Sequence, residues 1–157
     1  MQQVITALLF DGDAQEALDL YTSVFRDALV VERGYFGEGM PFPAGTLLSA
    51  LVDLGTARIL LINGGEGVPH THAASIMLHC DDQAEIDWYW ERLSEGGTQG
   101  SHGWLADRFG VWWQVVPASL GPMLLDSDRE RADRVMAAML RMTRFDIAAL
   151  ERAYAGA

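Results

Sequence analysis

The chain has a single cysteine, Cys80, so no disulfide can form within it, and a reducing compartment is the natural setting. Basic residues are also scarce: 11 lysines and arginines stand against 22 aspartates and glutamates, for a formal net charge of −11. Nucleic acids and anionic membranes attract basic surfaces, so we expect neither as a partner. No apolar run approaches the roughly 18 residues of a membrane-spanning helix, and the N-terminal sequence lacks the pattern of a secretory signal. These absences predict a cytoplasmic protein.

Half of the 157 residues are hydrophobic, which is enough for a substantial core. A chain of this length forms one ordinary domain, or two small modules that share a core. We expect one globular domain overall.

Two stretches of the chain repeat one another. Residues 13–21 and 82–90 align without a gap at an offset of 69 residues. In each stretch an aspartate that can cap a helix is followed three residues later by a glutamate, and apolar residues follow at helical spacing. We infer an internal duplication and an α+β fold with two βαβββ-like modules, residues 1–66 and 74–120. The strand-like segments around the two helices are residues 4–10, 28–36, 46–54 and 57–62 in the first half, and 74–79 and 111–116 in the second.

Residues 121–157 have the composition of a C-terminal helical extension. Ser127 with Glu130 predicts a capping box at the start of one helix, and Asp146 is placed to cap a last short helix. Four of the seven methionines lie at or after Met123. Such a stripe favours core packing, with a subunit interface as the alternative, because methionine suits adaptable apolar contacts.

The strand at residues 111–116 carries one polar side chain. A turn at residues 107–110 precedes it, and side chains along a strand alternate between its two faces. One face is wholly apolar and should pack on helices, whereas the other places an amide between a tryptophan and a valine, where it needs a hydrogen-bond partner or a ligand. The two sets are Val111, Trp113 and Val115 on the first face, and Trp112, Gln114 and Val116 on the second.

Together these features resemble the vicinal-oxygen-chelate (glyoxalase/bleomycin-resistance/dioxygenase) superfamily. The similarity rests on the duplicated modules, on residues 10–25 and 104–117, and on Asn-Gly-Gly at residues 63–65. More narrowly, the chain resembles the PhnB-like branch, which often carries the label 3-demethylubiquinone-9 3-methyltransferase, and the similarity extends to residues 132–139. The resemblance implies a mixed sheet that curls around a central cavity, commonly completed in a homodimer.

The resemblance also implies where a metal would bind. Metal-dependent members take their ligands, usually histidine or glutamate, from the first and last strands of each module. Counted back from the capping aspartates, the first-strand positions are Thr6 and Ser75, and the last strands offer Gln114 and residues 61–63. These side chains include no imidazole and no carboxylate, so they hold a transition metal poorly. We therefore expect neither a tightly bound metal nor a cofactor.

We expect the cavity to bind a small organic molecule. Hydroxyl and amide groups would form hydrogen bonds to it, and tryptophans would provide apolar or stacking walls. The alternative is that the polar groups bond one another or buried water, and that the cavity binds nothing. The predicted pocket residues are Thr6, Asn63, Ser75, Trp104, Trp112 and Gln114.

The histidines and the cysteine are weaker candidates for chemistry. His79 shares the strand parity of Ser75 and is a weak candidate for a catalytic acid or base, with a turn cap as an equal alternative. His70 and His72 form a pair that chelates zinc only with a third ligand, and no Cys or Glu stands at matching spacing, so we favour solvated loop histidines. Cys80 is followed by two aspartates, which do not stabilise a thiolate, so it is a poor nucleophile.

Three functional classes remain open. We favour metal-independent binding of a small organic molecule. The alternatives are a divalent-metal-dependent enzyme of the glyoxalase or dioxygenase type, and a purely structural or regulatory dimer with a filled cavity. The methyltransferase label is not supported by the residues, because a doubly wound cofactor domain needs alternating strands and helices, whereas this sequence predicts hairpins.

Overall fold

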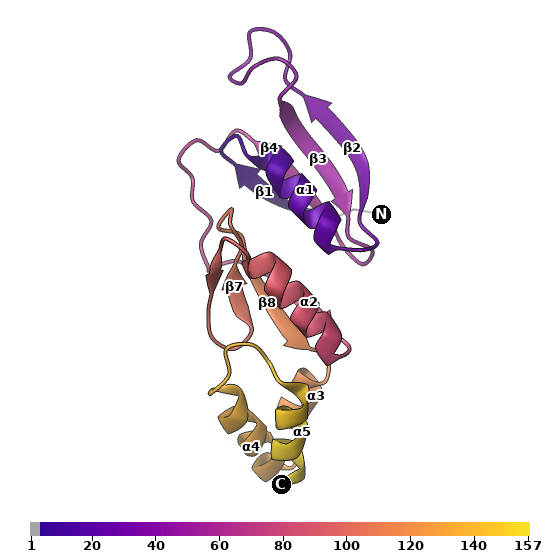
Figure 1. Cartoon of the computed structure of the whole chain (residues 1–157), viewed down its shortest axis with the longest axis vertical. Coiled ribbons are helices and arrows are strands. Elements are labelled where there is room, and N and C mark those ends of the chain that lie inside the picture. The colour runs from indigo at the N-terminus through magenta and orange to yellow at the C-terminus, as the bar shows by residue number, and fades with distance from the viewer. Residues whose placement is uncertain (1–3) are drawn as a thin grey trace. The chain divides into compact units, whose positions relative to one another are not determined.

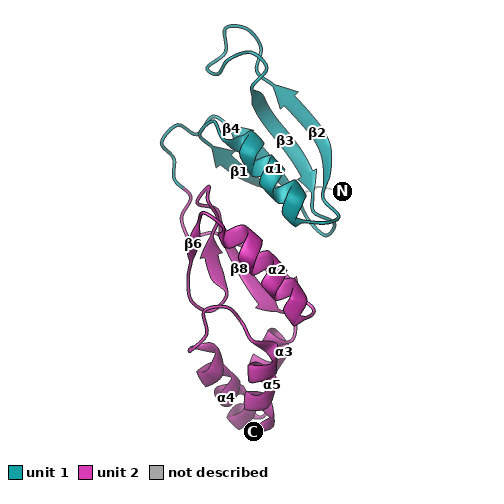
Figure 2. Ribbon diagram, in the orientation of Figure 1, with its two compact units in different colours: residues 1–69 teal, residues 70–157 magenta. Residues whose placement is uncertain are grey.

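The computed structural model describes residues 4–157. The chain divides into two compact units, residues 1–69 and residues 70–157 (Figure 2). Each unit holds one four-stranded mixed sheet with a helix on one face, and unit 2 adds three C-terminal helices. Among the residues that the structure describes, no helix is long and apolar enough to cross a membrane.

Sheet A, the sheet of unit 1, has the strand order β1-β4-β3-β2. β1 runs parallel to β4, and the other neighbours are antiparallel. The helix α1 lies on one face of this sheet (Figure 1). The elements of unit 1 are β1 (Thr6–Phe10), α1 (Ala14–Val24), β2 (Leu29–Tyr35), β3 (Leu47–Asp53) and β4 (Arg58–Asn63).

Alternating burial along the strands explains why α1 packs on sheet A. Ile59 and Leu61 of β4 are buried, while Leu60 between them is partly exposed. Leu18 and Tyr21 of α1 are buried as well, because the helix directs its apolar stripe at this face. We call the face under the helix the covered face of each sheet, and the opposite one the open face.

Sheet B, the sheet of unit 2, repeats this topology with the strand order β5-β8-β7-β6. β5 runs parallel to β8, and the other neighbours are antiparallel. The helix α2 packs on its covered face (Figure 1). The elements are β5 (Ile76–Cys80), α2 (Gln83–Ser94), β6 (Thr98–Gln99), β7 (Trp104–Ala106) and β8 (Trp112–Pro117).

The two faces predicted for residues 111–116 are confirmed. The apolar set, Val111, Trp113 and Val115, is buried together with Leu93 of α2. The predicted turn before the strand is also present, because the backbone N–H of Gly110 donates to the carbonyl oxygen of Asp107 at 2.9 Å.

The α+β fold with duplicated modules is thus confirmed, with one difference in the sheets. Instead of one sheet that curls around a cavity, the chain has two separate four-stranded sheets, and neither closes. The C-terminal helices predicted after residue 120 are present as α3 (Leu120–Leu124), α4 (Arg129–Met139) and α5 (Ile147–Ala155).

Two of the predicted helix caps are confirmed and two are wrong. Asp82 accepts from the N–H of Glu85, and Asp146 accepts from that of Ala149, both at 2.9 Å. The prediction of Ser127 as the cap of α4 is wrong by one residue, because Asp128 holds the extended backbone of the N-cap and accepts from the first turn.

Asp13 was predicted to cap α1 with its carboxylate, and this prediction is also wrong. Its backbone is not extended, and its side chain makes no capping hydrogen bond. The acceptor comes instead from Asn63 at the end of β4, whose Oδ1 takes the N–H groups of Gly12 and Ala14, each at 3.1 Å. A residue distant in sequence therefore satisfies the start of α1.

Candidate functional site

The open face of sheet B gathers most of the predicted pocket residues. Strand pairing places Met77 of β5 and Trp104 of β7 on either side of Gln114, in the middle of the sheet. Trp112 lies two residues before Gln114 on the same face of β8, and His79 lies two residues after Met77 on the same face of β5. Side chains from three strands thus converge on one surface.

Gln114, the amide that the sequence left without a partner, is hydrogen-bonded to Ser75. Its Nε2 donates to Ser75 Oγ at 2.8 Å. One N–H of the side-chain amide is therefore satisfied. The Oε1 atom makes no hydrogen bond to another residue of the described chain. The bond fixes the glutamine side chain between β5 and β8 with its carbonyl oxygen still available.

Aromatic rings line the same face. The rings of Trp104 and Trp112 lie 6.4 Å apart in an edge-on arrangement. His72, from the loop before β5, packs edge-on against Trp112 at 5.6 Å. Such edge-to-face contacts hold large rings in defined positions without a hydrogen bond.

A cavity of about 410 Å³ lies between this face and the C-terminal helices. Its floor includes Met77, His79 and Gln114, and Trp104 forms part of its wall. We use the word roof for the cavity-lining residues that follow β8, which are Ala118, Leu120, Gly121, Pro122, Leu124, Met139 and Phe145. The size and the mainly apolar lining are typical of small-molecule sites.

Two histidines line the cavity, and both are held by their Nε2 atoms. Nε2 of His79 lies 3.1 Å from the sulfur of Met77, and Nε2 of His102 lies 3.2 Å from the carbonyl oxygen of Leu140. His102 has a positive φ of 57°, and its backbone N–H donates to Met142 O at 2.9 Å. These bonds attach the turn before β7 to the segment after α4.

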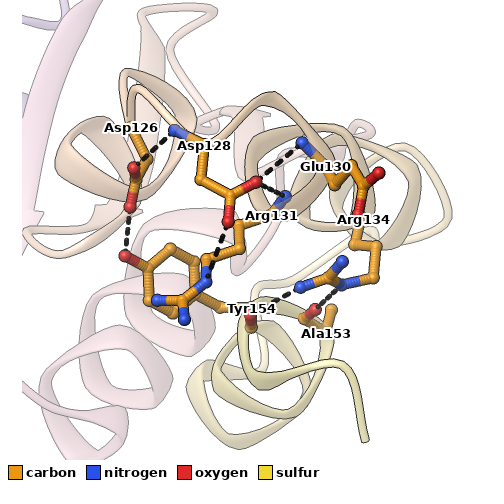
Figure 3. A network of polar contacts seen from close by, with 7 residues as sticks. All are labelled: Asp126, Asp128, Glu130, Arg131, Arg134, Ala153 and Tyr154. Atoms are coloured by element: carbon orange, nitrogen blue, oxygen red, sulfur yellow. Dashed lines mark hydrogen bonds and ion pairs between the residues drawn. The ribbon is translucent and has the colours of Figure 1, made fainter.

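A polar network joins α4, α5 and the loop that follows α3 (Figure 3). The hydroxyl of Tyr154 donates to Asp126, and the guanidinium of Arg131 lies over the tyrosine ring, 5.3 Å from its centre. Arg131 also pairs with Asp128 at 3.3 Å. Arg134 donates to two carbonyl oxygens at the end of α5, at 2.8 and 3.1 Å. We call this set the latch.

The latch lowers the pKa of Asp126 below its ordinary value of 3.8. The first cause is the hydrogen bond from the Tyr154 hydroxyl, and the second is the backbone N–H of Asp128. Because hydrogen bonds to the charged form favour that form, the carboxylate stays ionised across the physiological range.

Thr6 does not correspond to Ser75, and the face predicted for it is wrong. β1 ends at Phe10, three residues before the N-cap of α1, whereas β5 ends at Cys80, two residues before the N-cap of α2. The loop in unit 1 is therefore longer by one residue, and counting back from the caps shifts the register by one. Because Thr6 pairs with Ile59, it belongs to the covered face.

Asn63 lies in unit 1 and makes structural hydrogen bonds. It is 2% exposed, and besides accepting from the start of α1 it donates to the carbonyl oxygen of Leu47 at 2.8 Å. A separate hollow of about 480 Å³ borders it, with Asp11, Phe42 and Glu66 among the lining residues. Its binding role remains a prediction, but the amide is already committed to the backbone.

The most buried carboxylate of unit 2 was not recognised from the sequence. Asp107 is 2% exposed, and its Oδ1 accepts from the N–H groups of Phe109 and Val111 at 2.9 and 3.1 Å. Its Oδ2 accepts from the indole N–H of Trp113 at 2.9 Å. A buried tryptophan on an apolar face needs an acceptor, and the aspartate at the head of the preceding turn is in reach.

Cys80 fits the prediction of a poor nucleophile. It is 1% exposed, and burial, followed by the nearby charges of Glu85, Asp81 and Asp82, raises the pKa of its thiol to about 12. The thiolate, which is the reactive form, is therefore disfavoured at physiological pH.

Comparison with known proteins gives the family. A PhnB protein from Bacillus cereus, whose name carries a 3-demethylubiquinone-9 3-methyltransferase label, is 29% identical; the match covers 74% of this chain and 100% of that protein, with a TM-score of 0.69. A protein from Pseudomonas aeruginosa is 24% identical over 74% of this chain and 98% of its own, with a TM-score of 0.62.

More distant structures share the fold alone. The fosfomycin resistance protein FosX from Mesorhizobium loti is 18% identical over 80% of this chain and 98% of its own, with a TM-score of 0.56. No curated protein matches the chain. The model of the family described as 3-demethylubiquinone-9 3-methyltransferase matches residues 2–116, so α3, α4 and α5 lie beyond the matched part. The chain therefore belongs to this PhnB-like family of the glyoxalase fold.

Proposed function

We propose that the chain binds a small organic molecule in the cavity between the open face of sheet B and the roof. The observation that carries the proposal is that Gln114, held by Ser75, faces a cavity of about 410 Å³ whose remaining lining is mainly apolar. Such a site suits a ligand with an apolar body and a few polar atoms.

The same geometry weighs against the alternative of a filled core. Met77, on the edge strand β5 of sheet B, is 49% exposed, and His79 on the same face of that strand is also exposed. Side chains that merely filled a core would be buried and closely packed. Here they border open space.

A divalent-metal enzyme is the second alternative, and the residues at the expected ligand positions do not suit a metal. In unit 2 these positions hold Ser75 and Gln114, which bond each other. In unit 1 the strand pairing makes Leu60 the counterpart of Gln114. Leu60 pairs with Ala7, the second residue of β1, and Gln114 pairs with Met77, the second residue of β5. Neutral and aliphatic groups give a transition metal no anionic or imidazole ligand. Within residues 4–157 no three His, Cys, Asp or Glu side chains cluster as a metal site.

The methyltransferase label of the family gives no activity to this chain by itself, because function depends on the site and not on the fold. We keep homodimer formation as part of the proposal. Met136 and Leu140 of the α4 region are 40% and 57% exposed, and apolar side chains of this kind suit contacts between subunits.

Native mass spectrometry of the untagged, freshly purified protein tests the proposal. We expect a dimer mass, with or without a co-purified organic molecule, and no stoichiometric metal that is removed by dialysis against a chelator. A stoichiometric metal that the chelator removes would favour the alternative of a divalent-metal-dependent enzyme.

Substitution of Gln114 separates a binding site from a filled core. We expect Gln114→Ala to weaken binding of organic probes while changing the free energy of unfolding little. The matched control is Gln99→Ala, because Gln99 also donates to a serine, Ser94 Oγ at 3.1 Å, but lies outside the cavity lining. A large loss of stability in Gln114→Ala without any effect on probe binding would contradict the proposal.

A further inference from the structure

The polar groups that line the cavity define which ligands it can accept. No Asp, Glu, Lys or Arg is among its lining residues, although 21% of the whole chain is charged. The polar side chains that remain are His79, His102, Gln114 and the indole of Trp104. Recognition in this cavity therefore depends on neutral hydrogen bonds.

The partners of the two histidines determine which ring nitrogen carries hydrogen. A thioether sulfur and a backbone carbonyl can only accept, so Nε2 donates in both cases, to Met77 from His79 and to Leu140 from His102. In the neutral ring this leaves Nδ1 as an acceptor. Neither Nδ1 atom has a hydrogen-bond partner within the described chain.

Gln114 adds a third acceptor. Its Nε2 donates to Ser75, and its Oε1 has no protein partner among the described residues. The cavity thus offers two imidazole nitrogens and one amide oxygen as acceptors, and the Trp104 indole N–H and the second N–H of the Gln114 amide as donors. Acceptors outnumber donors, so a ligand must bring hydrogen to satisfy them.

We infer that the ligand is an apolar compound with a hydroxyl group that donates a hydrogen bond to His79 or His102. This inference rests on the proposed binding function and names the chemical class that the site selects. A hydroxyl both donates and accepts, so it meets an imidazole acceptor and the indole N–H together. An ether of the same shape only accepts, and a carboxylate brings negative charge to a site lined by acceptors in a chain with a net charge of −11.

Three probes of nearly the same size and shape test the ligand class. They are naphthol, methoxynaphthalene and naphthoate, substituted at the same ring position, and binding is measured by calorimetry at mildly alkaline pH with naphthol still protonated. We expect naphthol to bind about tenfold tighter than methoxynaphthalene, since one hydrogen bond contributes on this order. Naphthoate should bind most weakly.

Two variants locate the acceptor. His79→Leu removes an imidazole from an exposed strand position and should reduce the preference for naphthol over its methyl ether. His102→Asn removes the other imidazole, and asparagine tolerates the positive φ at this position. Circular dichroism verifies folding, and because His79 is exposed its variant remains informative if His102→Asn does not fold. Gln99→Ala should leave the preference unchanged.

The outcomes distinguish the inference from the proposed function. If no probe binds, the proposed binding function fails, and the inference fails with it. If naphthol and methoxynaphthalene bind equally, or naphthoate binds most tightly, the cavity is a binding site but its ligand is not a hydroxyl donor. If both histidine variants keep the full preference for naphthol, the assignment of the acceptors to His79 and His102 is overturned.

Discussion

Sheets A and B have the same strand order but differ on their open faces. The first and last strands of sheet A expose aliphatic side chains there, such as Leu9 and Leu60. The corresponding strands of sheet B carry His79 and Gln114. The covered faces are mainly apolar in both units, because each must pack against a helix. The two modules thus share an apolar covered face, whereas the side chains on their open faces differ in chemical type.

The hairpins between the third and fourth strands show the same contrast. In unit 1, Asp53 accepts from the N–H of Gly55 at 2.9 Å and pairs with Arg58 on the surface. In unit 2, Asp107 accepts from the N–H of Phe109 at the same spacing, but it is buried against Trp113. One turn motif therefore serves a solvated hairpin in unit 1 and a buried one in unit 2.

The largest expected effect is the substitution Asp107→Ala. It leaves two backbone N–H groups and the Trp113 indole N–H without their acceptor in a buried site, which should lower the free energy of unfolding of unit 2 by about 3 kcal/mol. Because all five tryptophans lie in unit 2, urea denaturation followed by tryptophan fluorescence reports on this unit.

Asp53→Ala is the matched substitution in unit 1. Asp53 is partly exposed, and its pKa is lowered chiefly by the backbone N–H of Gly55 and then by Arg58. We expect a much smaller loss of stability, measured by hydrogen exchange of β3 and β4, because water replaces the lost partners. Equal losses in the two variants would remove the distinction between a buried and a solvated turn.

The second effect concerns the helix caps. Asn63→Ala removes the acceptor for Gly12 and Ala14 and the donor to Leu47, all at a buried position, so we expect a loss of about 2 kcal/mol in unit 1. Asp82→Ala removes one exposed capping bond in unit 2 and should reduce stability by about 1 kcal/mol. Hydrogen exchange of α1 and α2 measures both; a greater loss in α2 would contradict the contrast between a tertiary and a local cap.

The smallest effect concerns the latch, which belongs to unit 2 alone because the described part of unit 1 has no counterpart of α3, α4 and α5. Because the pKa of Asp126 is lowered in the folded state, its contribution to stability is present above pH 3.8 and is lost as the pH falls through the lowered value. Tyr154→Phe removes the first cause of the shift. We expect the variant to be slightly less stable than the original near neutral pH and equal to it in strong acid.

Urea denaturation at a series of pH values, again followed by tryptophan fluorescence, measures this difference. Asp126→Asn provides the control, because it removes the titrating group and should abolish the pH dependence of the difference. A stability gap between Tyr154→Phe and the original protein that persists unchanged into strong acid would assign the role of Tyr154 to packing alone.

Much of the fold followed from local patterns in the sequence. The caps Asp82 and Asp146 lie next to the helices that they serve, so spacing alone was enough to identify them. The alternation around Trp113 likewise gave the correct covered face. Asn63 could not be recognised as the acceptor for α1, because its partners lie about fifty residues away in the sequence and only the fold brings them together.

Part of the candidate site followed from strand parity, which is a short-range property. Of the predicted pocket residues, Trp104 and Gln114 line the cavity, while Ser75 and Trp112 lie beside them on sheet B outside its lining, and the binding role of all four stays a prediction. His102 was not predicted as part of the site, because its place depends on hydrogen bonds to the segment after α4. The roof was not predicted either, since helical periodicity says nothing about which sheet face a helix will meet.

The extra residue between β1 and α1 means that no single numerical shift superimposes the two halves. Helix positions correspond at an offset of 69, as in the N-caps Asp13 and Asp82, whereas the strand ends Phe10 and Cys80 differ by 70. A designer who wished to restore symmetry by copying Ser75 into the first half would have to change Ile5 and leave Thr6 alone. The inserted residue therefore decides which substitutions can be transplanted between the repeats.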